Sequence, residues 1–119
     1  MNVTLTMANN IDELESNHKL TLWSKIQSYE TIFIIDVDGV SVGYISYQES
    51  NNTITKFEVV ESYRNSGIGT IALQKFLKKM KPYTDRVILH PISDSLCKYY
   101  ERFGFRKRLL NKDKMICKL

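Results

Sequence analysis

A glycine-rich turn between an extended segment and a helical one is the feature that most constrains this chain. Residues 53–60 have the pattern of a strand, residues 68–80 have the pattern of a helix, and residues 61–70 connect them, with glycines at 67 and 69. The start of a helix leaves main-chain N–H groups without partners, and the helix dipole adds partial positive charge there. Because glycine has no Cβ, a ligand can approach such a turn closely. The turn therefore predicts a phosphate-binding site.

Three phosphate-binding patterns compete for this turn. A Walker loop requires a Lys before Thr70 and a longer spacing between the glycines, and the sequence has neither. Residues 67–72 fit the dinucleotide pattern G-x-G-x-x-A, but too little chain follows for a second mononucleotide-binding half. The third pattern, Arg/Gln-x-x-Gly-x-Gly/Ala, is matched by residues 64–69. An ordinary turn with small residues at a helix start remains the structural alternative.

Length and composition indicate one folded domain, which we assign to residues 1–119. The chain is 43% hydrophobic and 25% charged, a balance typical of globular proteins. It has no apolar run long enough to cross a membrane and no secretory signal pattern, so we expect a cytoplasmic protein without a membrane partner. Cys97 and Cys117 lack metal-ligand spacing; we expect two buried, reduced thiols and no metal site.

The net charge of +4 suits an anionic ligand. It would also suit nucleic acid, but the basic residues are divided between two places, and a charged face near a helix end usually serves solvation. The two groups are Lys75, Lys78, Lys79 and Lys81, and Arg102, Arg106, Lys107 and Arg108. Direct nucleic-acid binding is therefore not favoured.

Hydrophobic periodicity predicts a mixed α/β fold. Asp38-Gly39 is a two-residue hairpin turn, so three consecutive antiparallel strands should lead into the glycine turn. The strand that follows the central helix should lie parallel to and beside residues 53–60. The predicted strands are 2–7, 31–37, 40–48, 53–60, 86–90, 105–110 and 114–119, and the predicted helices lie between 10 and 26, at 68–80 and after the cap at Ser93 or Asp94.

A second motif, Tyr100-Glu101-Arg102-Phe103-Gly104-Phe105, follows the glycine turn after one helix and one strand. The two motifs in this order resemble the GCN5-related N-acetyltransferase (GNAT) family, and the resemblance extends from about residue 31 onward. It implies the GNAT fold: a six- to seven-stranded, mostly antiparallel sheet with one central parallel pair and helices on both faces. It also implies acetyl-CoA as the cofactor.

The resemblance also implies which residues hold the cofactor. The turn would bind the pyrophosphate through main-chain N–H groups, and pantetheine would enter where the two parallel strands separate at their carboxyl ends and pair with them as a surrogate strand. Ser93 stands where many relatives have Asn, which is a longer side chain. The cofactor-binding residues implied are Val59, Val60, Arg64, Asn65, Ser66, Gly67, Ile68, Gly69, Thr70 and Ser93.

Tyr100 matches the general acid of the family. A phenol (pKa ~10) can donate a hydrogen bond to a departing thiolate (thiol pKa ~8.5), and it gives up its proton only reluctantly. The structural alternative is that Tyr100 only packs, since it belongs to the apolar stripe of its helix. We assign the neighbouring Tyr99 to the core.

No general base is evident at the positions where relatives carry one. Those positions correspond to Thr53, Thr55 and Ile88, none of which can take up a proton. The nearby ionisable residues are Glu58, Glu61, His90 and Asp94, for which solvation or helix capping is the simpler role. The hypothesis that follows is an acceptor amine that is partly neutral at pH 7, with water as the base.

We therefore predict an acetyl-CoA-dependent N-acetyltransferase that moves the acetyl group directly to a primary amine of a small molecule or peptide within a ternary complex. One alternative is a non-catalytic CoA-binding or regulatory module on the same fold. Another is a basic interaction protein whose partner is nucleic acid or an acidic protein. The strands of the closing hairpin offer an edge for pairing with a second copy, which would give a homodimer.

Overall fold

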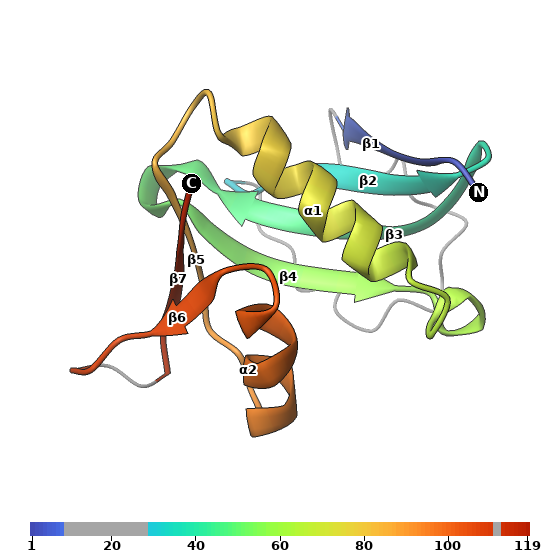
Figure 1. Ribbon diagram of the computed structural model, residues 1–119. Coiled ribbons are helices and arrows are strands. Elements are labelled where there is room, and N and C mark those ends of the chain that lie inside the picture. The colour runs from blue at the N-terminus through green and yellow to red at the C-terminus, as the bar shows by residue number, and fades with distance from the viewer. Residues whose placement is uncertain (9–28, 111–112) are drawn as a thin grey trace.

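The computed structural model describes residues 1–8, 29–110 and 113–119, which form a seven-stranded mixed sheet and two α-helices (Figure 1). The strand order β1-β2-β3-β4-β5-β7-β6 contains one parallel pair, β4 with β5, so the predicted mixed, mostly antiparallel sheet of the GNAT fold is confirmed. The helical region expected between residues 10 and 26 lies outside the described residues. The strands are β1 (Val3–Ala8), β2 (Thr31–Val37), β3 (Val40–Gln48), β4 (Thr53–Val59), β5 (Arg86–Leu89), β6 (Phe105–Lys107) and β7 (Met115–Lys118), the helices α1 (Ile68–Met80) and α2 (Asp94–Glu101), and the short 3-10 turns η3 (Glu49–Asn51) and η4 (Glu61–Tyr63).

The strands from β1 to β4 form a continuous antiparallel half of the sheet. β1 is paired with β2 along its whole length, from Val3 opposite Val37 to Ala8 opposite Ile32. The turn between β2 and β3 has two residues with positive φ, 50° at Asp38 and 86° at Gly39, as the predicted hairpin requires. β4 then pairs with β3 along most of its length.

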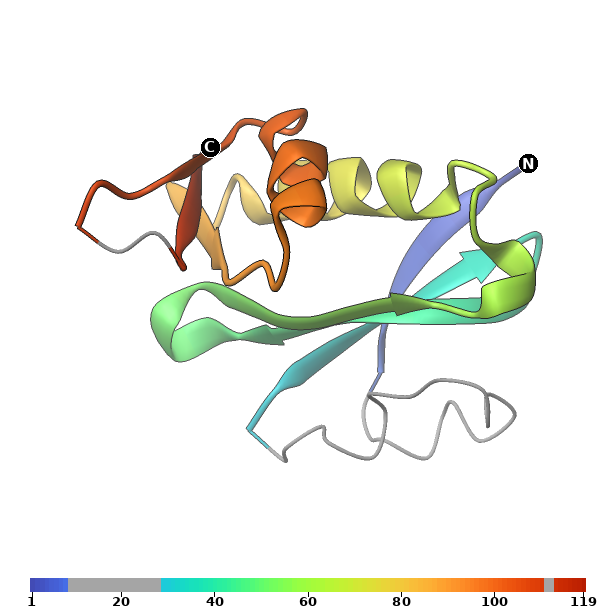
Figure 2. The same cartoon turned by 90° about the horizontal axis from the view of Figure 1, so that it is seen from below.

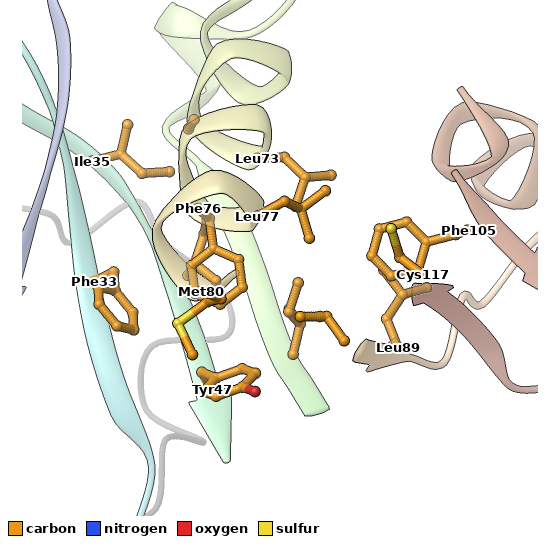
Figure 3. Packing of buried hydrophobic residues seen from close by; sticks show 14 of the residues in the cluster. Phe33, Ile35, Tyr47, Leu73, Phe76, Leu77, Met80, Leu89, Phe105 and Cys117 are labelled. Carbon is orange, nitrogen blue, oxygen red and sulfur yellow. The ribbon is translucent and has the colours of Figure 1, made fainter. Parts of the chain in front are cut away.

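Helix α1 covers one face of this half and supplies much of the core. Its buried side chains follow the predicted stripe: Ile68, Ala72, Leu73, Phe76, Leu77 and Met80. Figure 3 shows Phe76 projecting from α1 toward Phe33 and Tyr47, and both ring pairs meet edge to face with centroids 5.3 Å apart. Figure 2 shows that α2 lies on the same side of the sheet as α1.

The junction between β4 and β5 has a different character. The two strands are parallel neighbours, as predicted, but the register contains a single pair, Thr53 with Ile88. There the Ile88 N–H donates to the carbonyl of Asn52 at 2.8 Å. The strands separate beyond this bridge. The separation therefore begins near the start of β4, whereas the resemblance implied a separation at the carboxyl ends of the two strands.

A β-bulge lies at the point where β4 leaves β5. Ser46 of β3 pairs with Lys56 and Tyr47 pairs with Ile54, so Thr55 has no partner in the ladder. The Thr55 hydroxyl instead donates to the carbonyl of Ser46 at 3.2 Å. A bulge bends its own strand and increases the local twist. We infer that this extra residue directs β4 away from β5.

The carboxyl-terminal hairpin is shorter than predicted. β6 ends at Lys107 instead of Leu110, and Leu109 and Leu110 are fully exposed. Because neither leucine side chain is buried, no hydrophobic burial favours extending the strand to Leu110. The two predicted thiols, Cys97 and Cys117, are free and buried, as expected. Within the described residues no helix is long and apolar enough to cross a membrane.

Candidate functional site

The glycine turn presents an uncapped helix start. Asn65 and Gly67 both have positive φ, 62° and 83°, and Gly67 occupies the N-cap position of α1 without any side-chain cap. The first helical hydrogen bond runs from the Ile71 N–H to the Gly67 carbonyl. The N–H groups of residues 68–70 therefore have no acceptor among the described residues, and they gather partial positive charge at the helix start.

The first turn of α1 borders an open pocket, which Gly69 and Thr70 line. Its described lining residues are Val59, Tyr63, Arg64, Asn65, Gly67, Gly69, Thr70 and Tyr99. A Cβ built on Gly69 would lie 3.5 Å from Phe57 and 3.8 Å from the hydroxyl of Tyr99, so it would fit beside the protein while taking up space in the pocket. The missing side chain leaves a cradle at the positive end of the helix, which suits an anionic group.

Arg64 fastens the loop to the end of β4. Its Nε donates to the Val59 carbonyl at 2.7 Å, and its guanidinium lies 3.8 Å from the buried carboxylate of Glu58. Because β5 has already separated at this level, the Val59 carbonyl has no neighbouring strand on that side. The Arg64 side chain supplies the donor that a strand would have supplied, which stabilises the open edge.

Val60 already uses both of its main-chain groups. Its N–H donates to the Val42 carbonyl at 2.7 Å, and its carbonyl accepts from the Tyr63 N–H at 2.9 Å. The Val60 N–H is therefore already used and cannot take part in the pantetheine pairing expected there, and its carbonyl already accepts one hydrogen bond. Ser66 lies in the loop, where its hydroxyl donates to the Tyr63 carbonyl at 2.6 Å.

Tyr100 lines a second pocket, in the opening between β4 and β5. The other lining residues are Ile54, Thr55, Lys56, Phe57, Leu89, His90, Pro91, Ile92 and Leu96. Burial, with a smaller contribution from Tyr99, raises the pKa of Tyr100 to about 12. Its ring meets those of Tyr99 and Phe105 edge to face, at 5.3 and 5.8 Å between centroids. The phenol is thus fixed in position and fully protonated near neutral pH.

Ser93 lies at the start of α2 as its N-cap. Its hydroxyl accepts from the Leu96 N–H at 3.2 Å and lies 3.1 Å from the hydroxyl of Ser95. It does not belong to either set of pocket-lining residues given above. The structure therefore gives Ser93 a capping role that accounts for its side chain.

The predicted substitutes for a base are dispersed. Glu58 is buried and accepts from the hydroxyl of Tyr44 at 3.2 Å, whereas Glu61 and Asp94 are exposed. His90 lines the Tyr100 pocket, and its Nδ1 lies 3.2 Å from the carbonyl of Asp113. His90 is thus the imidazole among the described lining residues of that pocket.

Tyr99 is a pocket residue that the sequence pattern assigned to the core. Its ring does pack against core residues, but its hydroxyl lies 3.1 Å from Thr70 Oγ1 and borders the glycine turn. A phenol placed on an apolar stripe usually needs a partner for its hydroxyl, and that was the available signal. The bulge at Thr55 was also missed, because it depends on cross-strand register.

The fold is that of solved acetyltransferases. A GNAT family acetyltransferase from Elizabethkingia anophelis with acetyl-CoA bound has a TM-score of 0.72 and 14% identity, covering 99% of both chains. The PaiA N-acetyltransferase from Thermoplasma acidophilum in complex with coenzyme A has a TM-score of 0.73 and 16% identity, covering 100% of both. The ribosomal-protein-S18-alanine N-acetyltransferase from Escherichia coli has a TM-score of 0.68 and 16% identity, covering 97% of this chain and 91% of that one.

The sequence profile of the acetyltransferase (GNAT) family matches residues 4–105. The chain therefore belongs to the GNAT acetyltransferase family, and the predictions of family and of an acyltransferase are confirmed. No curated protein matches the sequence.

Proposed function

We propose that this protein is an acetyl-CoA-dependent N-acetyltransferase that transfers the acetyl group directly to a primary amine of a small molecule or peptide in a ternary complex. The observation that carries the proposal is the parting of β4 from β5 after one residue pair, with the uncapped start of α1 at one end of the opening and Tyr100 within it. We place it in the cytoplasm, because both of its cysteines are free thiols.

The described residues fit the cofactor. The N–H groups of Ile68, Gly69 and Thr70 are suited to hold the diphosphate, in the cradle that Gly69 leaves open. N–H groups of successive strand residues point to opposite edges, and the Val60 N–H points to β3. The Val59 N–H is therefore expected to face the opening, where a pantetheine amide takes the place of the absent strand.

Tyr100 is proposed to stabilise the departing sulfur. Bound acetyl-CoA supplies the thioester and a leaving thiolate. A phenol with a pKa of about 12 is a weaker acid than a thiol of pKa ~8.5, so Tyr100 donates a hydrogen bond to the sulfur and keeps its proton through most of the reaction. Because the pKa is raised to about 12, Tyr100 keeps its proton near neutral pH and should add no inflection to a pH–rate profile there.

Deprotonation of the acceptor is assigned to water or to the acceptor's own equilibrium. An α-amine with a pKa of ~7.7–8.0 is partly neutral at pH 7, whereas a lysine amine at ~10.4 is not. A pH–rate profile that follows the pKa of each acceptor in turn supports this assignment. An inflection near pH 6–7 that disappears in His90→Ala would give the role of base to His90 instead.

The decisive experiment measures thiol release from acetyl-CoA with a panel of amines, beside the thermal unfolding of the protein with and without acetyl-CoA. A ligand at 100 times its dissociation constant stabilises the folded state by ~2.7 kcal/mol, which is a readily measured rise in Tm. We expect both stabilisation and release with small α-amines and peptide N-termini. Stabilisation without release across the panel would support the alternative, a non-catalytic CoA-binding module. If acetyl-CoA neither stabilises the protein nor releases its thiol, both proposed functions are refuted.

A further inference from the structure

We propose that Tyr99 is a further cofactor-binding residue, whose hydroxyl donates a hydrogen bond to a phosphate oxygen of the cofactor's diphosphate. The proposal rests on the proposed function, since it assigns a contact within the same site. It gives the two adjacent tyrosines of α2 different tasks. Tyr99 acts at the diphosphate end of the opening and Tyr100 at the thioester end.

The position of the Tyr99 hydroxyl carries the proposal. It lies 3.1 Å from Thr70 Oγ1, in the first turn of α1, and it lines the same pocket as Gly67 and Gly69. A Cβ on Gly69 would lie 3.8 Å from the Tyr99 oxygen, so the hydroxyl borders the cradle at the helix start. One side chain from α2 thus reaches the anion-binding end of α1.

The Tyr99 ring is held on several sides. The rings of Phe103 and Tyr100 contact it edge to face, with centroids 5.1 and 5.3 Å away. The guanidinium carbon of Arg102 lies 5.9 Å from its centroid. A ring fixed in this way presents its hydroxyl with little further loss of conformational entropy when a ligand binds.

The hydrogen bonding in the pocket suits an anionic acceptor for the Tyr99 hydroxyl. In the pair formed by Thr70 and Tyr99 either oxygen can be the donor. When Thr70 donates to Tyr99, the phenol proton is free to point into the pocket, and a hydroxyl that accepts one hydrogen bond becomes a better donor of the next. No carboxylate belongs to the described lining of the pocket, and the nearby Val59 carbonyl already accepts from Arg64. A phosphate oxygen satisfies the remaining donor.

The test compares a ligand that has the diphosphate and its attached nucleotide with one that lacks both. Dissociation constants for acetyl-CoA and for acetyl-pantetheine, which lacks the diphosphate and the 3′-phosphoadenosine, are measured calorimetrically for wild type, Tyr99→Phe and Thr70→Val. Because a hydrogen bond to a charged group is lost, we expect Tyr99→Phe to weaken acetyl-CoA binding about tenfold and to change acetyl-pantetheine binding less than about twofold. Thr70→Val should act in the same direction, and the double variant should lose little more than Tyr99→Phe alone, since the two hydroxyls act as a unit.

Controls separate this contact from packing. Tyr99→Phe keeps the ring beside Tyr100, so the variant should stay folded, with its Tm lowered only by the loss of the hydrogen bond to Thr70. Thr70→Ser keeps the hydroxyl and should keep the affinity for acetyl-CoA. Tyr83→Phe alters an exposed tyrosine and should leave the dissociation constants of both ligands unchanged.

The outcomes distinguish this proposal from the function on which it rests. The wild-type titration tests acetyl-CoA binding by itself. If wild type binds acetyl-CoA and Tyr99→Phe binds it equally well, the role of Tyr99 is overturned and the proposed function stands. The role is likewise overturned if Tyr99→Phe weakens both ligands by the same factor, because the hydroxyl would then act elsewhere than on the diphosphate.

Discussion

The two neighbours of β4 in the sheet pair with it to very different extents. Toward β3, β4 is paired along most of its length, but toward β5 it is paired at Thr53 alone (Figure 1). The continuous antiparallel ladder holds the strand firmly from one side. That support allows the other edge to remain open inside the sheet without loss of the strand. The comparison indicates that the regular half is what makes the irregular half usable as a site.

The space around two glycines, Gly43 and Gly69, shows the same contrast between the two halves. A Cβ on Gly43, in β3, would lie 2.3 Å from the main-chain oxygen of Glu58. A Cβ on Gly69, at the start of α1, would approach no atom closer than 3.5 Å. The first glycine is required by strand packing in the regular half. The second leaves space beside the opening.

The largest expected effect tests the chemistry of the open half. Tyr100→Phe removes the hydroxyl and keeps the ring that packs against Tyr99 and Phe105. General-acid groups typically contribute 10²–10⁴-fold, and we expect kcat to fall ~100-fold because a hydrogen bond to the sulfur is lost. Steady-state kinetics with the best acceptor measures this fall, and calorimetry should show the affinity for acetyl-CoA unchanged. An unchanged kcat would mean that Tyr100 serves only packing.

The next effect separates the two halves through their glycines. Gly43→Ala forces the side chain against main-chain atoms of β4, which cannot give way without disturbing the ladder, so we expect a loss of ~2 kcal/mol in the free energy of unfolding. Gly69→Ala should leave that free energy unchanged or raise it by up to ~1 kcal/mol, because Ala favours helix more than Gly. Denaturant unfolding measures both.

The same pair should show the reverse order in cofactor binding. Gly69→Ala fills the cradle and should weaken acetyl-CoA binding more than Gly43→Ala does under conditions where that variant remains folded, although Gly43→Ala also presses on the main chain of Val59. If Gly69→Ala binds acetyl-CoA as well as wild type does, the start of α1 is not where the diphosphate lies.

Local patterns in the sequence were sufficient for much of this architecture. The bounds of β2, β3 and α1 were predicted without error, because a two-residue hairpin turn and a glycine turn punctuate the chain there. The buried stripe of α1 followed directly from its period. The positions of the glycine turn and of Tyr100 beside one opening followed from the resemblance to the family.

Features that depend on contacts between segments far apart in the sequence could not be predicted from local patterns. The bulge at Thr55 is a mismatch between two strands, and neither strand reveals it alone. The phase of α2 placed Tyr99 and Tyr100 on one stripe, but it did not show that Tyr99 would reach Thr70 on another helix. The return of the Arg64 side chain to Val59 likewise follows from the open edge, which is a property of the assembled sheet.

A smaller effect tests how the open edge is maintained. Arg64→Ala removes the donor to the Val59 carbonyl and leaves the buried carboxylate of Glu58 without that neighbour. We expect a loss of ~1.5 kcal/mol in the free energy of unfolding, the usual worth of a hydrogen bond to a charged group, and weaker acetyl-CoA binding. Arg108→Ala, which changes an exposed arginine in the closing hairpin, is the matched control for loss of charge. Equal effects of the two substitutions would show that only net charge matters.

The smallest expected effect concerns Ser93, for which capping and cofactor contact make different predictions. The hydroxyl accepts from the Leu96 N–H, so Ser93→Ala should cost ~1 kcal/mol in the free energy of unfolding. Asn is also a good N-cap, so Ser93→Asn should restore that stability. If Ser93 only caps α2, acetyl-CoA affinity is the same in all three proteins. If instead affinity falls in Ser93→Ala and rises above wild type in Ser93→Asn, the side chain reaches the cofactor as well, and the opening extends farther along α2 than the lining of its two pockets indicates.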